Sequence, residues 1–295
     1  LATTVLLAAN KPIFFVPSMN VEMWKNPITQ RNIKFLKNNN FNFIGPDSGD
    51  LACGEEGEGR MSEPKEIVEQ ILLDLSSGLP LSNKEVLITA GPTYEAIDPV
   101  RFIGNRSSGK MGIALALECA NNGAKVKLVL GPSNVPVKHS NITIYKVESA
   151  SEMLKSVNIH FKSSDISIFT AAVADYTPKF FSKDKIKKTD DNLTISLIKT
   201  TDILSKMALS KSNKQFVVGF ALETEKELEY AKHKLQSKNL DMIVLNSLND
   251  CGAGFNSKTN KITIINRDQT VKAFGLKQKE DVAKDIIDYI FKKIK

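Results

Sequence analysis

Residues 88–112 read ITAGPTYEAIDPVRFIGNRSSGKMG and decide the fold of most of the chain. An apolar segment over 85–90 runs into Gly91 and a long polar loop, which ends in NRSSG at 105–109 before a helix of small residues. A parallel strand that leads through glycine into a helix N-terminus is a common anion site, because free backbone N–H groups and the helix dipole point at the anion. The stretch therefore predicts a nucleotide-binding α/β sheet, preceded by part of another domain.

Strands and helices alternate through the rest of this region. Strands are expected near 85–90, 124–130, 141–147, 165–170, 215–220 and 241–245, and helices near 109–122, 150–158, 202–210, 224–237 and 279–294. This alternation predicts a Rossmann-like, mostly parallel sheet with helices on both faces, over a domain of residues 84–295. Two segments break the pattern: an alternating strand over 193–198, and a hairpin over 261–274 that turns at 267–269.

Residues 1–75 predict a partial α/β unit, with strands over 12–16 and 41–44 and a helix over 27–38. The glycine-rich segment 45–61 is expected to be a mobile loop rather than an element. A further helix begins near Pro64, because proline is favoured in a first helical turn. Residues 76–83 are expected to be a linker. The chain opens within an element and without Met, so we expect the natural N-terminus to be missing.

Composition excludes several classes of function. The net charge of +7 is spread over scattered lysines with only five arginines, so no nucleic-acid partner is expected. The three cysteines have no CxxC spacing, which favours a reducing, cytoplasmic location. The three histidines are isolated, so a zinc site is not expected. No apolar run reaches the ~20 residues of a membrane span.

The GNRSSGK sequence of 104–110 fits part of a P-loop pattern, but Met111 follows where a hydroxyl must hold Mg²⁺. It also starts well after the strand that ends near Ala90, so a P-loop enzyme is rejected. The dinucleotide fingerprint GxGxxG is absent after the first strand. An NAD-dependent oxidoreductase is therefore disfavoured.

Further polar residues follow the ends of other predicted strands. Asp175 follows small residues that let a ligand approach the backbone, although a turn-capping aspartate is an equal alternative. Asp202 can bind a ligand or simply cap a helix. Lys234 and Lys238 share one helix face and can reach a triphosphate, or can be solvated. The lysine run at 185–188 has the same two interpretations.

Several motifs together resemble one family. The segments ITAGPT, IDPVRFIGNRSSGKMG, AAVADY, KIKK, VVGFALET and NSLNDCGAGFNSKTN are similar to the phosphopantothenate–cysteine ligase domain of the bifunctional coenzyme A biosynthesis family. The segments PSMN, MW and GDLACGEEGEGRM are similar to the end of its phosphopantothenoylcysteine decarboxylase domain. The resemblance covers essentially the whole chain, in the same order.

The resemblance implies a ligase that uses CTP and Mg²⁺ to join 4′-phosphopantothenate to cysteine through an acyl-cytidylate. It implies that Asn105 holds this intermediate, that Arg101 contacts the phosphopantothenate phosphate, and that Lys185 binds CTP and assists the chemistry. The implied nucleotide site also includes Phe169, Thr170, Ala171, Asp175, Thr201, Asp202, Ile203, Leu204, Phe220, Lys234 and Lys238. The family usually has Asn-Pro-Asp where this chain has Thr200-Thr201-Asp202, which keeps the aspartate but loses a rigid turn residue.

The resemblance also implies a flavodoxin-like decarboxylase half that binds FMN. Asn20 is then expected to bind its substrate, and Cys53 to donate the proton that reduces the enethiol intermediate. Because the family's catalytic histidine and most of its FMN phosphate loop precede this sequence, we do not expect the chain alone to decarboxylate. The family implies small-molecule substrates and a homo-oligomer with a ligase dimer. A non-catalytic nucleotide- or flavin-binding subunit is the alternative.

Overall fold

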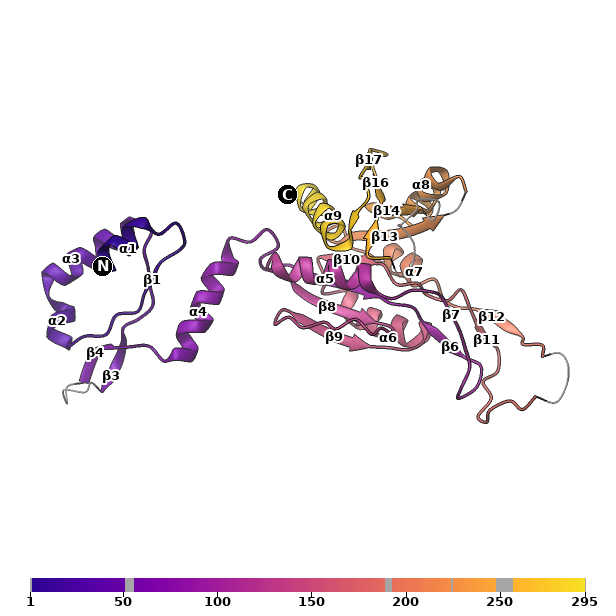
Figure 1. The fold of residues 1–295 in the computed structure, drawn as a ribbon, viewed down its shortest axis with the longest axis horizontal. Helices are drawn as coiled ribbons and strands as arrows, with labels where there is room; N and C mark the ends of the chain where they lie inside the picture. The colour runs from indigo at the N-terminus through magenta and orange to yellow at the C-terminus, as the bar shows by residue number, and fades with distance from the viewer. Residues whose placement is uncertain (1, 51–55, 189–192, 224, 248–256, 295) are drawn as a thin grey trace. The chain divides into compact units, whose positions relative to one another are not determined.

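The computed structural model describes residues 2–50, 56–188, 193–223, 225–247 and 257–294. The chain divides into two compact units, Leu1–Gly78 and Leu79–Lys295, and each is described by itself (Figure 1). None of the helices in the described ranges combines the length and the apolar content that a bilayer crossing needs.

The first unit is small and has short strands. Its elements are α1 (Ala2–Ala8), β1 (Phe14–Phe15), α2 (Val21–Lys25), α3 (Pro27–Asn38), β2 (Asn42–Phe43), β3 (Asp47–Asp50), β4 (Glu56–Arg60) and α4 (Pro64–Ser77). Strands β1 and β2 pair in parallel, and the Phe15 and Phe43 rings stack with centroids 5.2 Å apart. The sequence predicted α3 and α4 but missed α1 and α2, which are only seven and five residues long.

The prediction that 45–61 holds no regular element is wrong for the described residues 45–50 and 56–61. Strands β3 and β4 pair in an antiparallel arrangement with a register shift between Asp47 and Ser48. The glycines serve close packing: a Cβ on Gly59 would lie 2.2 Å from the backbone oxygen of Met19. The Met19 amide donates to the Gly59 carbonyl at 3.0 Å, so a side chain there would break this contact.

The second unit is built on an eight-stranded sheet. Its strands and helices in chain order are β5 (Glu85–Ala90), β6 (Tyr94–Ala96), β7 (Phe102–Gly104), α5 (Lys110–Asn121), β8 (Lys125–Leu130), β9 (Ile142–Lys146), α6 (Ala150–Phe161), β10 (Ile166–Phe169), β11 (Tyr176–Pro178), β12 (Leu197–Lys199), α7 (Ile203–Leu209), β13 (Phe216–Glu223), α8 (Glu227–Ser237), β14 (Met242–Ser247), β15 (Thr259–Asn260), β16 (Ile262–Asn266), β17 (Val271–Ala273), β18 (Lys277–Gln278) and α9 (Lys279–Ile294).

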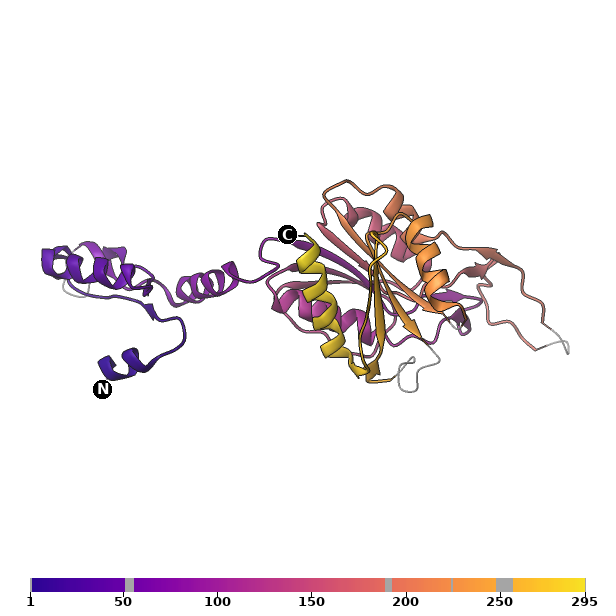
Figure 2. The ribbon, with the colours of Figure 1, turned by 90° about the horizontal axis from the view of Figure 1, so that it is seen from above.

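The sheet order is β17-β16-β14-β13-β10-β5-β8-β9, and the six strands from β14 to β9 are parallel. Figure 2 shows α9, in yellow, and α8, in orange, on opposite sides of the strands. From β5 the chain builds outward through β8 and β9, then crosses to β10 and builds the other way through β13 and β14. This is the doubly wound order of a Rossmann sheet, with its switch point between β5 and β10. The predicted α/β class is therefore confirmed, and so is the β16–β17 hairpin.

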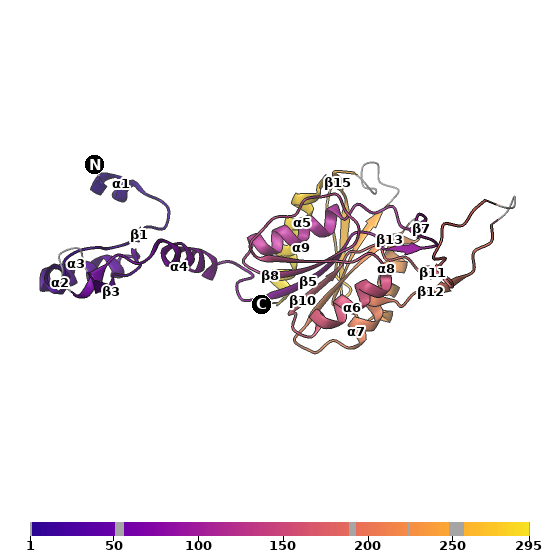
Figure 3. The ribbon, with the colours of Figure 1, turned by 90° about the horizontal axis from the view of Figure 1, so that it is seen from below.

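Helices cover both faces of this sheet (Figure 3): α5 and α9 pack on one face, and α6, α7 and α8 on the other. Strand β5 contributes side chains to the hydrophobic cores on both faces of the sheet, since consecutive side chains of a strand point to opposite faces. Ile88 belongs to the same buried cluster as Leu115 of α5 and Ile286 of α9, whereas Leu87 belongs to the cluster that includes Val157 of α6 and Leu235 of α8. All six of these side chains are fully buried or nearly so.

Two antiparallel pairs form an arm that extends away from the sheet (Figure 1). Strand β6 pairs with β7, and β11 pairs with β12. The first pair lies within a stretch that the sequence predicted to be a polar loop. The strand expected over 193–198 is also wrong in extent, because the paired residues of β12 are 197–199.

Candidate active site

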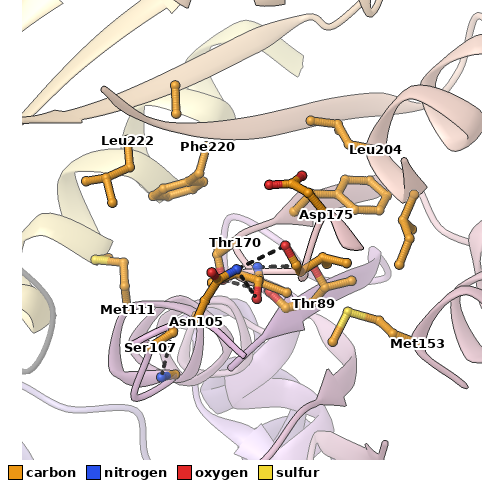
Figure 4. A pocket seen from close by; sticks show the side chains of 18 of the residues that line it. Thr89, Asn105, Ser107, Met111, Met153, Thr170, Asp175, Leu204, Phe220 and Leu222 are labelled. Carbon is orange, nitrogen blue, oxygen red and sulfur yellow. Dashed lines mark hydrogen bonds between the residues drawn. The ribbon is translucent and has the colours of Figure 1, made fainter. Parts of the chain in front are cut away.

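A cleft of about 820 Å³ lies where the strand order reverses. The carboxyl ends of β5, β10 and β13 form its floor, and the first residues of α5, α7 and α9 and one face of α8 form its walls. In open α/β sheets this is the position at which ligands bind. Figure 4 shows Asn105, Asp175 and Phe220, from three different segments, around the same open space.

Close backbone packing places the start of α5 at this cleft. Gly109 precedes the helix with φ 76°, a left-handed conformation that favours glycine. A Cβ on Gly112 would lie 2.4 Å from Thr170 Oγ1 and 2.5 Å from the Cβ of Ala90. The helix therefore sits directly against β5 and the end of β10. Gly109 has no side chain with which to cap this N-terminus, and the first-turn residues Lys110, Met111 and Gly112 line the cleft.

Asn105 is exposed but firmly held. Its Nδ2 donates to the carbonyl oxygens of Ala172 (3.1 Å) and Val173 (3.0 Å), as the dashed lines in Figure 4 show. Only the amide nitrogen can donate to a carbonyl, so these two bonds fix the orientation of the side chain. Its Oδ1 is thus directed away from the two carbonyls, at the edge of the cleft.

The segment after β10 is tied to β5 by side-chain and backbone bonds. Thr170 donates to the Thr89 carbonyl through its backbone N (3.1 Å) and its Oγ1 (2.7 Å). The Ala174 amide donates to Thr93 Oγ1 at 3.0 Å. This rigid turn presents exposed Asp175 to the cleft.

Two helices close one end of the cleft. Asp202 caps α7 by accepting a bond from the Ser205 amide (2.9 Å). Lys238, the residue directly after α8, donates from its Nζ to Asp202 Oδ2 at 2.6 Å. Burial raises the pKa of Asp202, but the bonds from Lys238 and Ser205 outweigh burial and hold the pKa below its ordinary value. Lys234 Nζ donates to the Phe220 carbonyl at 3.0 Å. Asp202 therefore caps a helix and also lines the cleft.

The structure brings most of the predicted ligase residues to this cleft. Those that line it are Asn105, Phe169, Thr170, Ala171, Asp175, Thr201, Asp202, Ile203, Leu204, Phe220, Lys234 and Lys238. Their individual roles stay predictions.

Arg101 and Lys185 do not line the cleft. Arg101 lies in the arm between β6 and β7, directly before Phe102. Its Nε donates to Asp98 Oδ2 at 3.0 Å, and its Nη2 donates to the Ile186 carbonyl at 2.8 Å. Exposed Lys185 is the neighbour of Ile186. The two predicted cations are thus held near each other, outside the cleft of their own chain.

Buried Asp98 organises this contact. Its carboxylate also accepts bonds from the amides of Val100 (2.9 Å), Arg101 (2.8 Å) and Ile186 (3.1 Å). The guanidinium of Arg101, with these amides, holds the pKa of Asp98 well below its usual range, against the effect of burial. Sequence reasoning missed Asp98, although its spacing of three from Arg101 was a visible signal.

Five lysines and two aspartates line the cleft among the described residues, so its surface is net positive. The sequence did not single out Lys199, Asn246, Asn260 or Lys279. For Lys279 there was a signal, because a lysine at the start of a helix opposes the helix dipole.

The two sites predicted for the decarboxylase half lie in the first unit. Asn20 caps α2, and its Oδ1 accepts bonds from the amides of Glu22 (2.8 Å) and Met23 (3.4 Å). Cys53 lies outside the described residues. In the described ranges of the whole chain, no three His, Cys, Asp or Glu side chains form a ready-made metal site.

Comparison with known proteins gives two family matches. The model of the DNA/pantothenate metabolism flavoprotein C-terminal domain matches residues 81–294, and the flavoprotein model matches residues 1–76. Among curated relatives, a protein named cysteine/cysteine sulfinic acid decarboxylase, from an unknown prokaryotic organism, is 48% identical over 97% of this chain and 81% of its own length. The coenzyme A biosynthesis bifunctional protein CoaBC of Bacillus subtilis (strain 168) is 44% identical over 98% of this chain and 71% of its own length.

Solved structures agree with these matches. The C-terminal domain of a coenzyme A biosynthesis bifunctional protein CoaBC is 40% identical, with a TM-score of 0.63, and covers 74% of this chain and 98% of that one. A Cab2 mutant in complex with phosphopantothenate-cysteine has a TM-score of 0.59 over 79% of this chain and 96% of that one. At 20% identity this second likeness shows the fold alone.

Proposed function

Because the chain belongs to the family of coenzyme A biosynthesis bifunctional enzymes, we propose that its second unit is a CTP-dependent phosphopantothenate–cysteine ligase. The observation that carries this proposal is the cleft at the switch point, with Asn105 fixed at its edge by two carbonyl groups. A net positive cleft suits a nucleoside triphosphate, because cations stabilise the charge that develops as pyrophosphate leaves.

The proposed reaction has two steps. A carboxylate oxygen of 4′-phosphopantothenate attacks the α-phosphorus of CTP, so that pyrophosphate leaves and an acyl-cytidylate forms. The cysteine amine then attacks the acyl carbon, CMP leaves, and the amine loses a proton as the amide forms. Asn105 is assigned to hold the acyl-cytidylate. Because its side chain is fixed beside the strand ends, it can keep the reacting phosphorus and the acyl carbon in place for the two attacks.

We assign recognition of CTP to the end of the cleft between α7 and α8. The segment 201–204 contributes the start of α7, and Phe220 contributes an aromatic surface for a base. Lys234 and Lys238 supply positive charge, and Asp175 supplies a carboxylate for a polar group of the nucleotide. Residues 169–171 form part of the floor, and Thr170 and Ala171 are small enough for a ligand to approach the backbone closely.

The residues of this cleft fit a Mg²⁺ ion whose ligands come mainly from the phosphates of the nucleotide and from water. The lining carboxylates in the described ranges are Asp175 and Asp202, and Asp202 already binds Lys238. Mg²⁺ commonly keeps several waters and takes one or two carboxylates with substrate phosphates. Asp175 is the residue that can contribute, and the ion would supply charge neutralisation at the phosphates.

We infer a homodimer in which Arg101 and Lys185 serve the cleft of the second subunit. Neither residue lines the cleft of its own chain, and the arm that carries them exposes Val100, Phe102 and Phe180. Mixing an Asn105→Asp chain with a Lys185→Gln chain tests this. Activity recovered in the mixture, but in neither variant alone, would support shared sites, and no recovery in a mixed dimer would contradict them.

The first unit is proposed to belong to an FMN-dependent decarboxylase that acts on 4′-phosphopantothenoylcysteine. The flavoprotein match to residues 1–76 supports this assignment. Asn20 is proposed to contact the substrate and Cys53 to donate the proton. The described residues show no cradle in which the fit of FMN can be tested, so no step is assigned to the flavin. A Cys53→Ser variant of a flavin-loaded protein should accumulate the enethiol intermediate, because the proton needed for its reduction is not supplied. Formation of 4′-phosphopantetheine at the normal rate would contradict the role of Cys53.

The ligase proposal is tested by mass spectrometry of reactions with and without cysteine. With 4′-phosphopantothenate, CTP and Mg²⁺ alone, we expect the acyl-cytidylate. Addition of cysteine should convert it to phosphopantothenoylcysteine and CMP. A nucleotide that binds but is never consumed would favour the alternative of a non-catalytic binding subunit.

A further inference from the structure

Lys279 is a nearly buried lysine at the cleft, on the opposite side of the sheet from α7 and α8. It is the first residue of α9, is only 7% exposed, and lines the cleft. Its Nζ donates to the Ser257 carbonyl at 2.8 Å. Within the described ranges, no carboxylate lies at ion-pair distance from this ammonium group. Burying a charge without a counter-ion is costly, so this position needs an explanation.

A second lysine lies at the same end of the cleft. Lys110 is the first residue of α5, which packs against α9 on the same face of the sheet, and it also lines the cleft. Burial lowers the pKa of Lys279, and the positive charge of Lys110 lowers it further. The adjacent Glu280 acts in the opposite direction without cancelling the shift. Two cations that repel each other therefore face one space.

The local helices strengthen this positive field. The N-terminal end of a helix carries the positive end of the helix dipole and attracts anions. A lysine in the first turn adds its own positive charge at the same place. Here two neighbouring helices of 12 and 16 residues begin with lysine at the same cleft. Nearly buried Asn260 joins them, and its Nδ2 contacts Asn246 Oδ1 at 3.3 Å. The combination of lysines, amides and helix starts matches what binds phosphate in proteins.

We propose that Lys279 and Lys110 form a second phosphate-binding end of the cleft, opposite the end between α7 and α8. This inference rests on the proposed ligase function and specifies which residues receive a phosphate group of a substrate. Two substrates of the proposed reaction carry such a group: the triphosphate of CTP and the phosphate of 4′-phosphopantothenate. A cleft of about 820 Å³ is near the upper end for small-molecule sites and has room for both.

The test measures the equilibrium affinity of the full chain for two pairs of ligands. The members of each pair differ in the phosphate groups they carry: CTP against CMP, and 4′-phosphopantothenate against pantothenate. Lys279→Gln should weaken one phosphorylated ligand about tenfold or more, as expected for lost charge-assisted bonds, and should leave its partner unchanged. A loss for CTP but not CMP assigns the site to the triphosphate. A loss for phosphopantothenate but not pantothenate assigns it to that phosphate.

Lys284→Gln is the matched control, because it removes the same charge from an exposed position of α9 that does not line the cleft. Lys110→Gln should weaken the same ligand as Lys279→Gln, and it decides the question if Lys279→Gln does not fold. Unchanged affinity for both phosphorylated ligands, or an equal loss for both members of a pair, would overturn the inference. If the unaltered chain bound neither CTP nor phosphopantothenate, the ligase proposal itself would fail.

Discussion

Asn105 shows how a single exposed side chain can be fixed for chemistry. Two backbone carbonyls, those of Ala172 and Val173, accept from its Nδ2, so its position depends on the turn after β10. Sequence patterns identified Asn105 as polar at the start of a helix, and the family resemblance suggested its role. They could not identify its partners, which lie more than sixty residues away in the chain.

Asn105→Asp should abolish most ligation while the protein stays folded. A carboxylate at this position would face two carbonyl oxygens without a donor and would leave its place. Loss of one positioned polar group typically costs ~10²–10³ in kcat. Loss of these two hydrogen bonds should lower the free energy of unfolding by about 1–3 kcal/mol, which leaves the protein folded.

The rate at which cysteine and CTP are consumed measures the loss of ligation, and thermal unfolding shows whether the variant stays folded. Asn121→Asp makes the same change on an exposed position of α5 and should leave turnover unaltered. Equal turnover of the Asn105→Asp and unaltered chains would remove Asn105 from the mechanism.

Asp98 should make the stability of the second unit depend on acid. Its pKa is depressed in the folded protein, so its contribution is complete above the ordinary aspartate pKa of about 3.9 and is lost as the pH falls toward the folded value. Asp98→Asn should therefore lower Tm at neutral pH. The difference in Tm from the unaltered chain should shrink as the pH falls below about 4.

Thermal unfolding at a series of pH values measures that difference. Asp184→Asn is the control, because Asp184 is an exposed aspartate close to Ile186 and should show no such trend. A Tm difference that stayed constant from neutral pH to acid would mean that the charge of Asp98 is not what stabilises the arm.

At the scale of elements, regular periodicity made most of the fold predictable. The buried residues of β5, with the apolar faces of α5 on one side and α6 on the other, specify a sheet covered on both sides. The failures share one physical cause. The β3–β4 pair and the arm are held by pairing between short segments that bury little apolar surface, so their sequences resemble loops.

Gly112 tests the close contact that places α5 at the cleft. Gly112→Ala should destabilise the protein by ~1–3 kcal/mol, because its Cβ would overlap Thr170 Oγ1 and Ala90. Denaturant unfolding measures this, with Gly275→Ala as a matched control whose Cβ meets nothing within 4 Å. Equal stability of the two variants would show that α5 can move away from the strands at little cost.

At the scale of the whole molecule, the second unit carries a complete core of its own. Every residue of its two apolar clusters lies within 81–294. A chain of residues 79–295 should therefore fold and should ligate as fast as the full chain. Circular dichroism and turnover check this together, and a folded but inactive second unit would mean that residues 1–78 help to assemble the ligase site.

The most direct test of the account is pyrophosphate release by the purified full chain. The assay supplies 4′-phosphopantothenate, cysteine and Mg²⁺, with either CTP or ATP. We predict release that requires phosphopantothenate and is faster with CTP than with ATP. A folded protein that released no pyrophosphate with either nucleotide, whether or not cysteine was present, would contradict the central claim that the cleft at the switch point is a ligase active site.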